Sequence, residues 1–103
     1  MIYFKIHDTD EGKILAMCDQ ELIGNVYEDG DILLDLKDYA DFYTGDLVRD
    51  NEVGIEPGEK FNSANVVGKA SVKVAIEKDI IKSENVKSVN GIPYAHAYWL
   101  DID

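Results

Sequence analysis

Apolar and polar positions alternate near both ends of the chain. Every second residue from Ile2 to Ile6 is apolar, which is typical of a strand that buries one face. Residues 13–18 are nearly all apolar and predict a central strand, joined to the first by a polar turn in a hairpin. Alternation returns over 94–100 after a short strand over 86–89 and a turn over 90–93, so a final hairpin is expected to close the sheet.

The middle of the chain is divided by turn signals. Asp29-Gly30 is the strongest of them and predicts a hairpin of two short strands, 25–28 and 31–36. Aromatic residues at helical spacing predict a short helix over 37–45. Residues 46–60 contain two glycines and a proline, and we expect a mobile surface loop there.

One long helix is predicted after this loop. Asn62 or Ser63 is the expected cap, and apolar residues recur at helical spacing from Ala64 to about Asp79. Strands followed by a single helix indicate the α+β class. The expected architecture is a single domain, residues 1–103, in which a mostly antiparallel sheet of hairpins packs in two layers against a helix over about 63–79.

Composition limits the class of protein. A chain of 103 residues with 46% hydrophobic content can bury a core of its own. Its one cysteine, Cys18, excludes an internal disulfide and fits a reducing compartment. The N-terminus lacks a signal-peptide pattern, and no apolar run approaches a membrane span. We therefore expect a soluble cytoplasmic protein without membrane contact.

Charge is divided unevenly along the chain. Residues 1–59 carry sixteen acidic and four basic side chains, a net charge of −12, whereas residues 60–103 carry five acidic and six basic ones, a net charge of +1. Much of this acidity serves solubility, but it also suits a basic partner. The acidic part should repel a nucleic-acid backbone, which disfavours direct nucleic-acid binding.

Several short motifs along the chain resemble those of one family. They are Cys18-Asp19-Gln20-Glu21-Leu22-Ile23-Gly24, Leu34-Asp35-Leu36, Phe42-Tyr43-x-Gly45, Ala64-Asn65-x-Val67-Gly68, Glu84-Asn85-Val86 and Gly91-Ile92-Pro93-x-Ala95. The chain resembles a family of small archaeal proteins known only as a domain of unknown function, and the resemblance extends over nearly the whole chain. The resemblance implies a cytosolic two-layer α/β domain without assigned activity, associated with translation or RNA handling.

The start of the predicted helix is the first candidate binding site. Free N–H groups and the helix dipole favour an anion there, such as a phosphate or a partner's carboxylate. Ser63 and Asn65 offer hydrogen bonds, Lys69 offers charge, and Gly68 permits close approach. The alternative is an ordinary cap, with Gly68 as a packing notch.

The final strand is the second candidate. His96 titrates near neutrality, and Tyr94 shares its strand face. Such a face stacks a nucleobase or contacts a peptide. The alternative is a half-buried aromatic strand that supports the sheet.

Catalytic and metal-binding patterns are not evident. Cys18 lies in an apolar run, where burial raises its pKa, and only two histidines are available as a base. The short acidic turns lack the spacing of a calcium loop, and no Cys/His cluster suits zinc. We expect no catalytic residue, no metal and no cofactor.

These features favour a non-catalytic binding or adaptor module that contacts a protein or ribonucleoprotein partner, in an oligomeric state that the sequence leaves open. The alternative is a small hydrolase or transferase with Tyr94, His96 and Asp35 around a cleft. Direct nucleic-acid binding would require four lysines to gather on one face away from the acids. These are Lys69, Lys73, Lys82 and Lys87.

Overall fold

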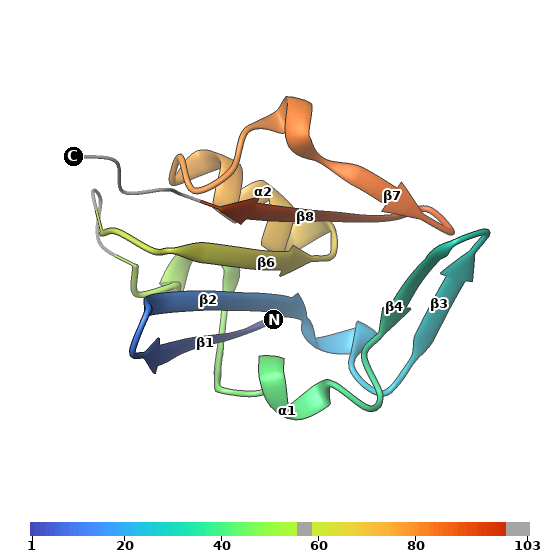
Figure 1. Cartoon of the computed structure of the whole chain (residues 1–103), viewed down its shortest axis with the longest axis horizontal. Helices are drawn as coiled ribbons and strands as arrows, with labels where there is room; N and C mark the ends of the chain where they lie inside the picture. The colour runs from blue at the N-terminus through green and yellow to red at the C-terminus, as the bar shows by residue number, and fades with distance from the viewer. Residues whose placement is uncertain (56–58, 99–103) are drawn as a thin grey trace.

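A six-stranded sheet forms the centre of the protein (Figure 1). The computed structural model describes residues 1–55 and 59–98. The strands are β1 (Ile2–Thr9), β2 (Gly12–Asp19), β5 (Asp46–Val48), β6 (Ser63–Val67), β7 (Lys87–Val89) and β8 (Ile92–Tyr98). Their order is β5-β1-β2-β6-β8-β7, and only β2 and β6 run parallel among these neighbours. The predicted α+β class is confirmed, and so is a mostly antiparallel sheet.

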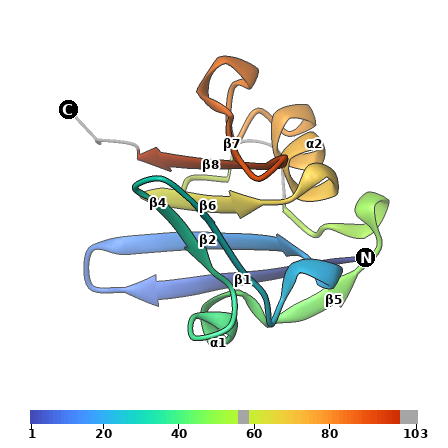
Figure 2. The ribbon, with the colours of Figure 1, turned by 90° about the vertical axis from the view of Figure 1, so that its right-hand side faces the viewer.

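The two faces of the sheet are covered by different elements. Helix α2 (Lys69–Glu77) packs on one face, and a separate hairpin of β3 (Val26–Asp29) and β4 (Ile32–Asp35) crosses the other. Figure 2 shows this hairpin in front of the sheet and α2 at the right-hand side of the sheet. The remaining elements are the helix α1 (Ala40–Tyr43) and the short 3-10 turns η1 (Gln20–Leu22), η2 (Asp50–Glu52) and η3 (Ser83–Asn85).

Strand β2 lies between two hydrophobic clusters. Leu15 and Met17 belong to the cluster under α2, whereas Ala16 and Cys18 belong to the cluster under the hairpin. All four are fully buried. The continuous apolar run correctly predicted a central strand, because both of its faces are covered.

Two tight turns lie where the sequence signals them. Gly30, at φ 62°, is in the two-residue turn between β3 and β4, which confirms the hairpin predicted from Asp29-Gly30. Asn90 and Gly91 both have positive φ and join β7 to β8. Such conformations match the twist of antiparallel strands and favour asparagine and glycine.

The long helix predicted over 63–79 is wrong in its first part. Residues 63–67 form the strand β6, and α2 has only nine residues. The short apolar run there fits a buried strand as well as a helix turn, and its valines suit a position between β2 and β8. Gly68, at φ 107°, ends the strand and precludes a continuous helix.

The surface loop predicted over 46–60 is wrong in two places, at a strand and at two buried residues. Strand β5 pairs with β1, and Val53 and Ile55 are buried in the cluster under α2. The two glycines and the proline predict a loop, so the sequence does not indicate that these apolar residues are buried. Residues 56–58, like residues 99–100 of the predicted last strand, lie outside the described residues.

In the part of the chain that the structure describes, no helix has the length and apolar character needed to cross a membrane.

Candidate functional site

The two candidate sites of the sequence meet on one face of the sheet. The antiparallel register of β6 and β8 sets Asn65 opposite His96 and Ser63 opposite Tyr98. Directly opposed residues project from the same face of a sheet. We call these four residues the β6–β8 face. Sequence analysis proposed its two halves separately, because the pairing of the strands was not visible in the sequence.

The strands beside the β6–β8 face add Lys5 and His7 to it, and both are bound to α1: Lys5 Nζ donates to the carbonyl of Asp41 at 3.1 Å, and His7 Nε2 lies 2.9 Å from the carbonyl of Phe42. Across β2 and β1, the row through Asn65 continues to Lys5, and the row through Ser63 continues to His7. In the described strands of the six-stranded sheet, no aspartate or glutamate is in register with this face. A chain with 21 acidic side chains therefore keeps them off one strand surface.

The aromatic residues of β8 differ in exposure. Tyr98 is 76% exposed, whereas Tyr94 is 8% exposed and belongs to the cluster under the hairpin. The rings of Tyr94 and His96 meet edge to face, with centroids 5.9 Å apart. Tyr94 therefore supports the sheet, as the alternative interpretation expected, while His96 and Tyr98 remain open to a ligand.

His96 has a perturbed titration. Partial burial lowers its pKa below 6.5, and the nearby Lys87 ammonium lowers it further because it repels the imidazolium. The imidazole is consequently neutral at pH 7 and can both donate and accept a hydrogen bond.

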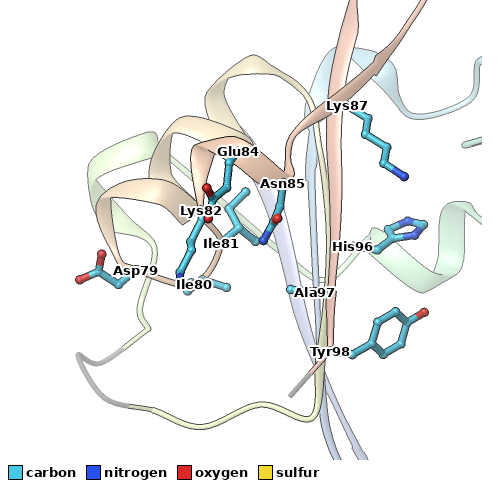
Figure 3. A pocket seen from close by; sticks show the side chains of 10 residues that line it. All are labelled: Asp79, Ile80, Ile81, Lys82, Glu84, Asn85, Lys87, His96, Ala97 and Tyr98. Atoms are coloured by element: carbon cyan, nitrogen blue, oxygen red, sulfur yellow. The ribbon is translucent and has the colours of Figure 1, made fainter. Parts of the chain in front are cut away.

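We expect Lys87→Gln to raise the pKa of His96, measured by NMR titration of its ring protons. Lys82→Gln is the matched control, because Lys82 lies on the other side of β8 (Figure 3). Because the pKa of His96 is lower in the folded protein, the unfolded chain binds this proton more readily. His96 therefore lowers the stability of the fold as pH falls below about 6.5, and it has no such effect above that pH. An unchanged pKa in Lys87→Gln would show that burial alone sets it.

A hollow of about 530 Å³ lies beside the edge of β8. Its lining includes Ile80, Ile81, Lys82, Glu84, Lys87 and Ala97. Figure 3 shows Lys87, His96 and Tyr98 on one side of β8 and residues 79–85 on the other. The Lys87–Tyr94 pair is the last one between β7 and β8, counted from their turn. The hollow exists because the residues before Lys87 and those after Tyr94 no longer pair with each other.

The backbone of β8 is directed into this hollow. Strand residues alternate in the direction of their N–H and C=O groups, and the closing pair of the β7–β8 hairpin is Val89 with Ile92. The N–H and C=O groups of Ile92 point toward β7, away from β6. His96 and Tyr98 follow Ile92 at even spacing along β8, so their backbone groups point in the same direction. Within the described residues these groups have no backbone partner, so they form a free strand edge.

The helix start does not lie where the anion site was predicted. Because α2 begins at Lys69, Ser63 and Asn65 lie in the preceding strand. The first turn of α2 is bound by the chain's own Asp19, whose carboxylate accepts from the Ala70 N–H at 3.1 Å and from the Ser71 N–H and hydroxyl at 2.8 Å each. This carboxylate takes the place of the predicted external anion.

The predicted caps have other partners. Asn62 donates from Nδ2 to the carbonyl of Glu11 at 2.6 Å, which fastens the β1–β2 turn. Gly68 lies against Asp19: a Cβ at Gly68 would come 2.3 Å from the carboxylate carbon. Sequence analysis missed Asp19 because the residue is far from α2 along the chain, and the adjoining apolar strand was its only local signal.

The groups considered for catalysis are engaged elsewhere. Burial, together with the carboxylates of Asp19 and Glu21, raises the pKa of the Cys18 thiol to about 12, in the direction that the apolar run predicted. The Asp35 carboxylate accepts from the backbone N–H groups of Lys37 and Asp38. Within residues 1–55 and 59–98, no three His, Cys, Asp or Glu side chains are grouped as metal ligands.

The four lysines considered for nucleic-acid binding do not gather on one face. Lys69 and Lys73 lie on α2, which covers the opposite face of the sheet from the β6–β8 face. Lys82 and Lys87 lie on different sides of β8, with Glu84 near Lys82 (Figure 3). The lysine surface that direct nucleic-acid binding would require is therefore not formed.

Comparisons with known proteins agree with the fold. The family model DUF424, described as a protein of unknown function, matches residues 6–100. A crystal structure of an uncharacterized conserved protein from Methanopyrus kandleri is similar with a TM-score of 0.79 and 21% sequence identity, over 99% of this chain and 94% of that chain. No curated protein matches the chain.

Proposed function

The chain belongs to DUF424, a family of proteins of unknown function, and we propose that it is a non-catalytic, cytoplasmic binding module for a protein partner, either free or within a ribonucleoprotein. The partner contributes an extended segment that pairs with the free edge of β8. One observation carries this proposal: β8 continues to Tyr98, whereas its neighbour β7 begins only at Lys87, opposite Tyr94.

Backbone hydrogen bonds supply the affinity in this form of recognition, and alternate side chains supply the specificity. The surroundings of the edge suit both. Side chains on one side of the added strand would meet Ile80, Ile81 and Ala97 in the hollow. Those on the other side would meet His96 and Tyr98, where the neutral imidazole and the phenol offer hydrogen bonds.

Peptides selected from a random library displayed on phage provide a defined probe for this edge. We expect His96→Pro to weaken their binding about tenfold, since proline removes the outward N–H of residue 96 and places its ring in the hollow. His96→Ala is the matched control: it removes the imidazole but keeps the N–H, and we expect a change of about threefold at most. Calorimetry with each purified variant measures both.

Proline at position 96 is tolerable because its N–H makes no bond to β6, and edge strands accept proline. Circular dichroism and the melting temperature verify that the variant is folded. Equal affinities of the proline and alanine variants would contradict pairing along the backbone. Selected peptides that leave the amide signals of His96 and Tyr98 unchanged in NMR spectra would contradict the site itself.

A further inference from the structure

The outer face of the β3–β4 hairpin is an unpartnered sheet face of mixed chemistry. The pairs Val26 with Asp35 and Glu28 with Leu33 place these four residues on one side of the hairpin. Val26 is 49% exposed and Leu33 is 57% exposed, although both are large apolar residues. The inner residues Tyr27 and Leu34 already pack against the sheet, so burial in the chain's own core does not explain the outer pair.

The hairpin is held firmly in position. At its base, the Gly24 N–H donates to the Leu36 carbonyl at 2.8 Å, and the Leu36 N–H donates to the Asn25 carbonyl at 2.9 Å. Nearer its tip, Asn90 donates from Nδ2 to the carbonyl of Glu28 at 3.0 Å. A surface fixed in this way loses little conformational entropy on binding.

The hairpin itself carries charge of one sign, with Lys37 following it directly and Lys87 on the adjoining β7. Residues 14–36 contain six acidic side chains and no lysine or arginine. Among the described residues, none of the hairpin carboxylates forms an ion pair with a lysine or an arginine. The field at the outer face therefore attracts cations, and repels both a nucleic-acid backbone and a second copy of this acidic chain.

We infer that the outer face of the β3–β4 hairpin docks a lysine- or arginine-rich segment of a protein partner that also carries large apolar side chains. The apolar side chains cover Val26 and Leu33, while the basic ones meet Glu28 and Asp35. This surface is separate from the free edge of β8 and does not depend on it. A chain with two such surfaces can hold two segments at once.

A short synthetic peptide of lysine and leucine in equal numbers, carrying a fluorescent label, is the probe. We expect Leu33→Thr and Glu28→Gln each to weaken its binding three- to tenfold, measured by fluorescence anisotropy at low salt. A peptide in which serine replaces leucine should bind about tenfold more weakly. Added salt should weaken the binding of both peptides, because it screens exposed charges.

Matched controls separate docking from a general attraction to an acidic protein. Leu47→Thr removes an exposed leucine from β5, and Glu77→Gln removes one carboxylate from α2 on the other face of the sheet. We expect both to bind the probe within twofold of the unchanged protein. Equal weakening by Glu28→Gln and Glu77→Gln would overturn the proposal in favour of net charge alone.

Two further outcomes would also overturn it. One is self-association of the unliganded protein that Leu33→Thr abolishes, which would assign the face to a second copy. The other is binding of the probe that leaves the amide signals of residues 26–35 unshifted in NMR spectra. Binding to the unchanged protein and to His96→Pro should be equal, so a failed β8 edge and a failed hairpin surface give different results.

Discussion

Asp19→Ala should lower the free energy of unfolding by about 3–5 kcal/mol. The Asp19 carboxylate is 4% exposed and accepts three hydrogen bonds from the first turn of α2. Its removal leaves the N–H groups of Ala70 and Ser71 and the Ser71 hydroxyl without their acceptor, and the helix dipole without its counter-charge. A loss of this size is a large part of the total stability of an ordinary domain.

Urea unfolding followed by circular dichroism measures this effect. Asp19→Asn keeps the shape but loses the charge, and we expect it to be destabilised by less than the alanine variant. Ser71→Ala removes only the hydroxyl bond and should lower the free energy of unfolding by about 1 kcal/mol. A loss below that value in Asp19→Ala would mean that water replaces the carboxylate.

Gly68→Ala should lower the free energy of unfolding by about 2–4 kcal/mol. Two causes act together. The backbone at Gly68 has φ 107°, which residues with a Cβ rarely adopt. The added Cβ would also lie 2.3 Å from the carboxylate carbon of Asp19, too close without movement of the strand or the helix.

Two other glycines separate these causes by the same urea measurement. Gly24 has φ 92° but nothing within 4 Å of its would-be Cβ, so Gly24→Ala reports the backbone strain alone. Gly54→Ala has neither feature and should be close to neutral. If Gly68→Ala is no worse than Gly24→Ala, the close approach to Asp19 is unimportant.

The Asp19–Gly68 contact also predicts non-additivity. In Asp19→Ala/Gly68→Ala, most of the carboxylate that the new Cβ would strike is absent. The double variant should therefore be more stable than the sum of the two losses predicts, by about 1 kcal/mol. Full additivity of the two losses would mean that Asp19 and Gly68 stabilise the fold independently of each other.

Local patterns predicted the elements whose signals are contained within a few residues. The apolar run at 13–18 identified β2, and Asp29-Gly30 identified the β3–β4 hairpin. The prediction at 63–67 failed because a short run of alanine, asparagine and valine satisfies a strand and a helix equally. Only pairing with β2 and β8 decides between them.

The candidate site was predictable only in fragments. Asn65 and His96 were each identified as a candidate, for different reasons and in different sites. Their position side by side depends on the register of β6 and β8. The free edge of β8 exists because β7 begins only at Lys87, and no single residue in the sequence specifies that point.

The sequence by itself determined the α+β class, the central strand, both tight turns and the acidity of residues 1–59, because each depends on neighbouring residues or on composition. Tertiary structure alone decided that residues 63–67 form a strand and that Asp19 binds a helix turn whose Ser71 lies 52 residues away. It also decided that no carboxylate of the described sheet strands is in register with the β6–β8 face. The physical reason is that these features follow from contacts between distant segments. Their free energy comes from burial and pairing across the sheet, and local preferences contribute little to it.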